Sequence, residues 1–373
     1  MKRGVDRVRP CMPTTMETIM KASILALGAL AACATASAQA QTNVTIYGIM
    51  DAAFVGERGG TAGSTSKITS GAASASRIGF RGTEQLGDGM TAFFTLETGA
   101  RIDTGTLDAN NTLFNRQAFV GLKGKAGAVA LGRQYTPWHQ ALAQVADPFA
   151  TGYAGSSKNL FADNGANVRA SNTILYTSPT LSGAFVELAY SLGEGADSAD
   201  GRQYGGAFGY ASGPLNLRLA YNSKNAETPV PGGRRGRNTL LAANYDLKWV
   251  KLYAGFNVDK GYNAAPLGNP NNPYGGVRPT ASTDGRELLL GLSAPVPGGT
   301  VLASVMHKDD RTGFNQDANA WGIGYLYPLS KRTNLYAAYG HIDNRNGAGY
   351  TVANNTEAGS GNTGYNLGVR HTF

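Results

Sequence analysis

The 373-residue sequence has few charged residues and almost no cysteine. Charged side chains make up 16% of the chain, and the two cysteines, Cys11 and Cys33, both lie in residues 1–40. Residues 41–373 therefore contain no disulfide, no cysteine metal site and no thiol nucleophile. No segment after Gln41 approaches the roughly 20 consecutive apolar residues that a membrane-spanning helix needs. A helical membrane bundle and a disulfide scaffold are both excluded for this region.

Short alternating segments are abundant instead. The chain has 51 glycines, and its 18 tyrosines outnumber its 13 phenylalanines. In "TAFFTLE", Ala92, Phe94 and Leu96 alternate with polar or aromatic neighbours, and similar segments recur to the C-terminus. Period-2 alternation bounded by turn residues predicts β-strands. We expect an all-β chain with a single domain over residues 41–373.

The N-terminal region resembles an export signal. Lys21 precedes the uncharged run "ASILALGALAACATASA", and small residues follow it up to Ala40. This order of charge, short apolar run and small residues is typical of a secretory signal peptide. We expect cleavage after Ala40, with residues 1–19 interpreted as upstream sequence and Met16 or Met20 as the start. A lipoprotein signal that ends at Cys33 is the alternative.

The charge balance after removal of this leader is mild. Residues 1–40 contain five Lys or Arg and two Asp or Glu, so 28 basic and 23 acidic residues remain, a net charge of +5. This surplus does not by itself indicate a nucleic-acid partner. The sequence offers no phosphate-binding loop or zinc spacing, and we expect no cofactor and no metal site.

Sixteen strands are predicted after the leader. They cover residues 42–55, 74–84, 89–101, 114–123, 127–136, 169–178, 183–193, 202–211, 214–223, 236–246, 249–259, 284–294, 299–309, 316–327, 332–343 and 363–373. Short turns alternate with mostly longer polar connections such as 56–73, 102–113 and 137–168. Strands of about ten residues with short turns at one end and long loops at the other are typical of outer-membrane barrels. We therefore predict a 16-stranded antiparallel transmembrane β-barrel.

The physics of lipid supports this architecture. Every backbone polar group inside a bilayer must be paired within the protein, which leaves helices or closed barrels. Tyrosines near the predicted strand ends would form the aromatic girdle at the lipid interface. The final "GYNLGVRHTF" alternates up to Phe373, which suits a last strand that closes the barrel. A soluble β-sandwich or propeller is the alternative, since both also alternate and are rich in turns.

Several motifs in order resemble the trimeric general porins of Gram-negative outer membranes. They are "NVTIYGIMDAAF", "SRIGFRGTEQLGDGMTAFFTLETG", "NRQAFVGLKGKAGAVALGRQYTP" and the terminal "GVRHTF". The resemblance implies a homotrimer in the outer membrane that conducts small hydrophilic solutes and ions through a water-filled pore. It also implies that Phe373 is read by the barrel-assembly machinery, and that the third long loop, 136–168, folds inside the barrel.

Arginines on inward-facing strand positions are the candidate pore residues. Arg77 and Arg81 share one strand face, while Ile78 and Phe80 occupy the other. A charge that faces lipid at mid-depth costs roughly 2–4 kcal/mol, so both arginines should face the lumen. Arg169 shares its face with serine and threonine and should do the same.

Two further arginines are indicated by their motifs. Arg116 in "NRQAF" and Arg133 in "LGRQYTP" match the family pattern, although each shares its parity with apolar residues. A β-bulge near Gly132, or the end of a strand, could reset that phase. We expect these arginines to face Asp147 and Glu97 across the pore, with a weak preference for anions.

Other functions remain open from the sequence. A substrate-specific channel is the nearest alternative, and an outer-membrane barrel enzyme or an adhesin is more distant. The enzyme would need a rim pair such as His341 and Asp343. The basic stretch with Arg234, Arg235 and Arg237 either contacts lipopolysaccharide phosphates, attracts anions to the pore mouth, or is a solvated loop.

Overall fold

The computed structural model describes residues 43–60, 63–194, 199–226, 235–261 and 282–373. The predicted signal peptide, its cleavage site after Ala40 and both cysteines lie outside the described residues, and so does Arg234.

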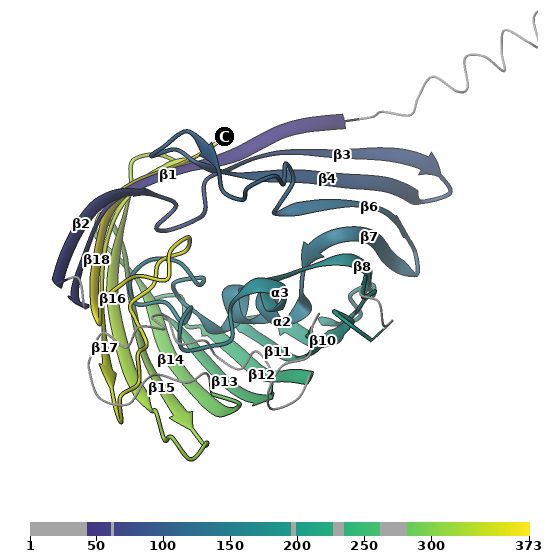
Figure 1. Ribbon diagram of the computed structural model, residues 1–373. Helices are drawn as coiled ribbons and strands as arrows, with labels where there is room; N and C mark the ends of the chain where they lie inside the picture. The colour runs from purple at the N-terminus through teal and green to yellow at the C-terminus, as the bar shows by residue number, and fades with distance from the viewer. Residues whose placement is uncertain (1–42, 61–62, 195–198, 227–234, 262–281) are drawn as a thin grey trace, which may run out of the picture.

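The described chain forms one antiparallel sheet that closes on itself (Figure 1). Its strands are β1 (Asn43–Gly60), β2 (Gly63–Ser70), β3 (Arg77–Gly87), β4 (Met90–Arg101), β5 (Thr106–Leu107), β6 (Gln117–Gly124), β7 (Gly127–Tyr135), β8 (Arg169–Thr177), β9 (Ala184–Ser191), β10 (Gln203–Ser212), β11 (Leu215–Asn225), β12 (Arg235–Asp246), β13 (Lys251–Gly261), β14 (Asp284–Val296), β15 (Gly299–Asp310), β16 (Ala318–Pro328), β17 (Thr333–Asn344) and β18 (Thr363–Thr372). Strands adjacent along the barrel pair with one another, and β1 also pairs with β18. Apart from β2, which pairs with the second half of β1, and the two-residue β5, sixteen strands close the barrel, so the predicted fold is confirmed.

The first strand is longer than predicted. β1 continues to Gly60, and its second half pairs with β2, for example Val55 with Lys67. Only its first half pairs with β3, where Ile49 lies opposite Arg77. The prediction of a loop over 56–73 was therefore wrong. Pairing with β2 on one side and β18 on the other satisfies the backbone of this polar stretch, which a local pattern of charges and glycines does not indicate.

Side chains along the strands alternate between an apolar outer face and a mixed inner face. In β14, Leu288 and Leu290 are 44% and 48% exposed, whereas Glu287 and Leu289, on the opposite face of the strand, are fully buried. This polarity is the reverse of a soluble barrel and matches a sheet whose outer surface meets lipid. None of the helices within the described ranges is long and apolar enough to cross a membrane.

The C-terminus closes the barrel. The backbone N–H and C=O of Phe373 each pair with Gly48 of β1 at 3.1 Å. A Cβ at position 48 would overlap the Phe373 ring, so only glycine lets β1 and the C-terminal residue approach each other this closely. In Figure 1 the C-terminus lies beside β1.

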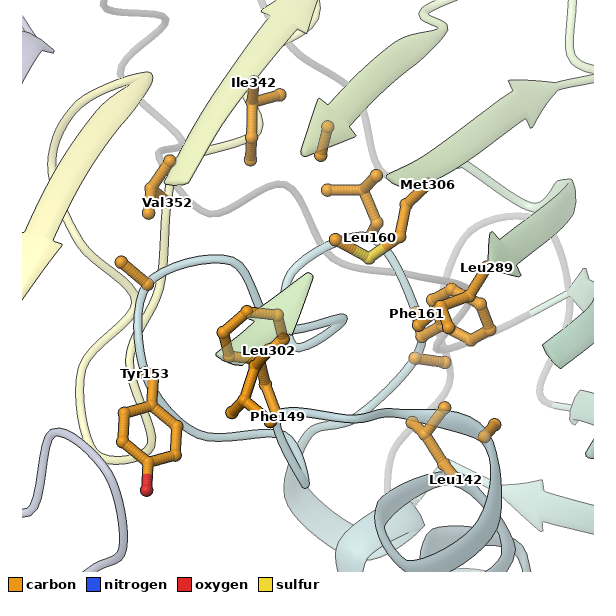
Figure 2. Close-up of a cluster of buried hydrophobic side chains, with 14 of the residues drawn as sticks. Leu142, Phe149, Tyr153, Leu160, Phe161, Leu289, Leu302, Met306, Ile342 and Val352 are labelled. Atoms are coloured by element: carbon orange, nitrogen blue, oxygen red, sulfur yellow. The ribbon is translucent and has the colours of Figure 1, made fainter. Parts of the chain in front are cut away.

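Residues between β7 and β8 lie inside the ring of strands (Figure 1). They contain α2 (Pro137–Ala141), the π-helical turn η1 (Leu142–Ala146) and α3 (Gly165–Val168), and we call residues 136–168 the inner loop. Its apolar side chains pack against the inner face of the barrel. Figure 2 shows Leu142, Phe149, Leu160 and Phe161 of the inner loop in one buried cluster with strand residues such as Leu289, Leu302 and Met306. The hydrophobic core thus lies in the lumen, between the inner loop and one side of the barrel.

Candidate functional site

A buried polar network anchors the inner loop to β13–β15. The Trp138 indole N–H donates to Asn257 Oδ1 at 3.1 Å, and the Asn257 amide donates to Glu287 Oε2 at 2.6 Å. The ammonium of Lys308, fully buried, donates to Glu287 and lies 3.6 Å from Asp259 Oδ2. A lone buried charge would be very costly, so these groups stabilise one another by mutual pairing. We call Asn257, Asp259, Glu287 and Lys308 the anchoring wall.

The Asp147 carboxylate is the centre of a hydrogen-bond network within the inner loop. The carboxylate accepts hydrogen bonds from the backbone N–H of Phe149, Thr151 and Ser157, at 2.8–3.1 Å, and from the Ser157 hydroxyl at 2.7 Å. Burial raises the pKa of Asp147, although these four donors favour its ionised form. The side chain is 2% exposed and does not line the lumen cavity. Asp147 therefore stabilises the fold of the inner loop. The expected position of Asp147 on the pore surface, facing the arginines, is not observed.

Four of the five predicted arginines line the lumen on the opposite side, from β3 to β8. They are Arg77, Arg116, Arg133 and Arg169, and we call them the arginine wall. Arg116 Nε donates to Glu97 Oε1 at 2.8 Å, and its Nη2 donates to the Tyr135 hydroxyl at 2.7 Å. Arg169 Nη2 donates to the same hydroxyl at 2.8 Å. Tyr135 thus joins two guanidinium groups that would otherwise repel each other.

Glu97 lies among these arginines. Its carboxylate contacts Arg116 and lies 3.9 Å from Arg77 Nη1, and it accepts a hydrogen bond from the Tyr47 hydroxyl at 3.0 Å. The expected position of Glu97 on the wall opposite the arginines is therefore not observed. Strand β4 lies directly beside β3, with Glu97 opposite Gly79, so the carboxylate and Arg77 share one inner face.

Arg116 and Arg133 share their strand parity with apolar residues, so the alternation did not fix the direction of their side chains. Both face the lumen, for separate reasons. Arg116 precedes the first residue of β6, so the alternation of that strand does not apply to it. For Arg133, the pairing of β7 with β8 shifts between Gly132 and Gln134. Such a bulge re-aims the side chain after it. Arg133 then donates to the Asn115 carbonyl at 2.6 Å and to Ser171 Oγ at 2.9 Å.

Arg81 lies apart from the others. It shares the inner face of β3 with Arg77 but is four residues nearer the short turn, where it is exposed and does not line the cavity. Its guanidinium lies 5.3 Å from the centre of the Tyr47 ring, within the range of a cation–π contact.

The inner loop presents its own charged groups to the arginine wall. His139 Nδ1 lies 2.5 Å from Asp163 Oδ1, and the His139 ring stacks on Tyr135 at 5.1 Å. Burial alone would raise the pKa of Asp163, but His139 and Lys158 outweigh it and the pKa is lowered. Burial also lowers the pKa of Lys158, whose ammonium donates to the Asn355 carbonyl.

A second loop reaches into the lumen, which the sequence did not indicate. Between β17 and β18, Tyr350 and Thr351 are fully buried. Asn159 of the inner loop donates to the carbonyls of Thr351 and Ala358, both at 2.8 Å. The two loops therefore hold each other in place and narrow the lumen together.

A cavity of about 1260 Å³ lies between the inner loop and the arginine wall. Its lining contains six lysines and arginines, namely Arg77, Arg116, Arg133, Lys158, Arg169 and Lys224. Three carboxylates line it, namely Asp108, Asp163 and Glu194. The cations thus outnumber the carboxylates two to one, and the described part of the chain places no group of three or more metal-ligating side chains together.

The chain is similar to known proteins of one family. A family model described as a Gram-negative porin matches residues 26–347. The chain belongs to the Gram-negative porin family. It is 32% identical to an outer membrane porin protein of Bordetella pertussis and 33% identical to outer membrane porin protein 32 of Delftia acidovorans, and each match covers 95% of this chain and all of the relative.

A solved structure supports the same assignment. The anion-selective porin from Comamonas acidovorans superposes with a TM-score of 0.74 at 28% identity, over 89% of this chain and all of that one. This porin therefore forms a channel in the outer membrane of a Gram-negative bacterium. The predictions of family, channel function and location are confirmed.

Sequence reasoning missed several lumen residues of this porin. Lys158 and His139 lie on the irregular inner loop, where no period applies. Arg218 on β11 could have been found, because it lies between Leu217 and Leu219 in an alternating segment. Arg218 donates to Gln144 of the inner loop at 3.3 Å and lies 4.0 Å from Glu187.

The pair that suggested an enzyme is a strand-neighbour contact. His341 Nε2 lies 3.1 Å from Asp343 Oδ1 on β17, and its Nδ1 lies 2.8 Å from Thr363 Oγ1. Thr363 is the residue directly opposite His341 on β18. Ordinary strand pairing accounts for this cluster.

Proposed function

We propose that this porin prefers anions and that the arginine wall and the inner loop form its constriction. The observation that carries the proposal is the two-to-one excess of cations over carboxylates around the cavity. Rings of arginine and lysine bias a pore towards anions. Within the wall, Glu97 offsets part of the charge, so the preference is modest rather than absolute.

Each predicted site residue has a place in this proposal. Arg133 and Arg169 act directly on passing ions, Arg77 and Arg116 share their charge with Glu97, and Asp147 keeps the inner loop folded. Arg81 acts on ions at the turn side of the constriction. The similarity to a porin described as anion-selective supports this assignment.

The further partners are part of the same proposal. The chain assembles as a homotrimer, with lipopolysaccharide as its neighbour in the outer leaflet. Phe373, which ends the closing strand, is the signal for the barrel-assembly machinery. Conduction is passive, and no catalytic step is assigned.

The test is the reversal potential of the purified porin in planar bilayers under a potassium chloride gradient. A unit charge about 7 Å from an ion contributes about 0.6 kcal/mol in water, and salt screening at 0.1 M reduces this to about half. We expect Arg133→Gln with Arg169→Gln to lower the chloride-over-potassium permeability ratio by about sevenfold, because each charge shifts chloride and potassium by about 0.3 kcal/mol in opposite directions. Arg286→Gln, on the outer face, is the control. A wild-type channel that prefers potassium, or a double variant with unchanged selectivity, would overturn the proposal.

A further inference from the structure

The Tyr135 hydroxyl lies between two guanidinium groups of the arginine wall. It accepts hydrogen bonds from Arg116 Nη2 at 2.7 Å and from Arg169 Nη2 at 2.8 Å. Arg169 is the residue directly opposite Tyr135 on the adjacent strand β8 (Figure 1), and its guanidinium carbon lies 4.4 Å from the centre of the Tyr135 ring. The His139 ring also stacks on Tyr135, so both the barrel and the inner loop hold this phenol in place.

These contacts restrict where the O–H hydrogen of Tyr135 can point. A phenol hydroxyl has two lone pairs and one hydrogen, and a guanidinium group donates hydrogen bonds but cannot accept them. The two arginines therefore occupy both lone pairs, and the hydrogen cannot be donated to either arginine. Within the part of the chain that the structure describes, no carboxylate or carbonyl oxygen is placed to accept it. The oxygens of Glu97 accept from Arg116 and Tyr47 instead.

The O–H of Tyr135 is therefore available to the lumen. Tyr135 lines the cavity between the inner loop and the arginine wall, together with Arg133 and Arg169. Hydrogen bonds in a chain polarise one another, so the two cationic donors on the oxygen make its O–H a stronger donor. A solute that reaches the constriction thus meets a neutral hydrogen-bond donor beside the fixed positive charges.

This donor discriminates between solutes differently from the arginines. The field of a guanidinium group acts on any anion according to charge and distance. A hydrogen bond needs a lone pair at about 2.7 Å, in line with the O–H. Formate concentrates its charge on its oxygens and accepts strongly, whereas perchlorate spreads the same charge over more oxygens and accepts weakly. The arginine wall therefore selects for the sign of the charge, and the hydroxyl selects among anions.

We infer that Tyr135 is a specificity-determining residue of the constriction, whose O–H donates a hydrogen bond to the passing anion and favours strong hydrogen-bond acceptors. Arg116 and Arg169 keep the hydroxyl oriented by occupying its lone pairs. The inference rests on the constriction proposed above, and adds a preference between anions of equal charge.

The experiment compares the wild type with Tyr135→Phe in planar bilayers, with sodium formate on one side and sodium perchlorate on the other. The reversal potential gives the formate-over-perchlorate permeability ratio. We expect this ratio to fall about fivefold in the variant, because one hydrogen bond contributes about 1 kcal/mol net. The chloride-over-potassium ratio should be retained, since Arg116 keeps its contact with Glu97 and Arg169 keeps the aromatic ring beneath it.

Tyr253→Phe is the matched control. Tyr253 lies on the inner face of β13 with Asn257, its hydroxyl lies 3.3 Å from Ser293 Oγ, and it does not line the cavity. This variant should keep both ratios. The heat-dependent shift of the barrel on a gel shows that each variant is folded. Acetate against trifluoroacetate is a second pair, because fluorine weakens the acceptor at the same charge, and this ratio should also fall in Tyr135→Phe.

The inference fails on any of three results. An unchanged formate-over-perchlorate ratio in Tyr135→Phe would show that the hydroxyl does not contact the anion. An equal fall in Tyr253→Phe would indicate a general effect of lumen tyrosines. A chloride-over-potassium ratio that falls as strongly would indicate that the hydroxyl only positions the arginines. A wild-type channel that prefers potassium contradicts only the proposed ion preference, because the formate and perchlorate comparison is made between anions.

Discussion

The two sides of the lumen use the same residue types in opposite ways. On the arginine wall, Arg133 and Arg169 line an open cavity in which cations outnumber carboxylates. On the anchoring wall, Lys308 is fully buried between Glu287 and Asp259, under the inner loop. The difference follows from burial by the inner loop. Charged side chains buried under the loop must be paired with opposite charges, whereas charged side chains that face the water of the pore can remain in excess. The position of the loop therefore decides which charges hold the fold and which act on ions.

Breaking the anchoring wall should have the largest effect. Lys308→Met leaves Glu287 and Asp259 buried without their cation, and removing one partner of a buried ion pair typically costs about 3–5 kcal/mol. We expect a lower unfolding temperature, measured by the heat-dependent shift of the folded barrel on a gel. Single-channel conductance should rise, because the inner loop loses its anchor. Lys331→Met, at an exposed turn, is the control. Unchanged stability and conductance would show that the network does not hold the loop.

Removing the Glu97 carboxylate, which pairs with Arg77 and Arg116 of the arginine wall, should sharpen the contrast. Glu97→Gln keeps hydrogen-bonding atoms for Arg116 and Tyr47 but leaves their surroundings more positive. We expect the chloride-over-potassium permeability ratio to rise about threefold, because removing one negative charge at about 7 Å stabilises chloride and destabilises potassium by about 0.3 kcal/mol each. Reversal potentials in bilayers would measure the change, with the exposed Glu84→Gln as the matched control. A fall in the ratio would contradict the assignment of Glu97 as the offset charge.

The smallest expected effect is a pH dependence. Burial lowers the pKa of Lys158, with Asp163 opposing this shift and Arg169 and Arg116 adding to it. The ammonium loses its proton as pH rises through this lowered value, so the cavity loses positive charge. Between pH 7 and pH 10 the anion preference should fall, by less than about threefold for one screened charge that acts on both ions. Reversal potentials over this range would measure it. Lys158→Met should remove this change, whereas Lys331→Met should retain it.

The barrel itself could be predicted from the sequence because its cause is local and repeated. Every strand must turn an apolar face to lipid and pair its backbone, so the period-2 pattern, the short turns and the terminal Phe373 all point to one architecture. The inward direction of Arg77 followed from the same alternation. β1 differed because β2, an added strand, pairs with its second half.

The local pattern did not determine the neighbours of the site residues. Glu97 lies among the arginines because β4 pairs with β3. Asp147 is buried inside the inner loop because the loop folds around its carboxylate. The phase of Arg133 depended on a register shift between β7 and β8.

The sequence by itself thus determined the strand number, the closure and the basic character of the lumen. Tertiary structure alone decided which charges face the water of the pore and which are neutralised under the loop. The physical reason is distance along the chain. Alternation acts between adjacent residues, whereas Trp138 and Asn257, and Asn159 and Thr351, are more than 100 residues apart along the chain and are brought together by the folded barrel.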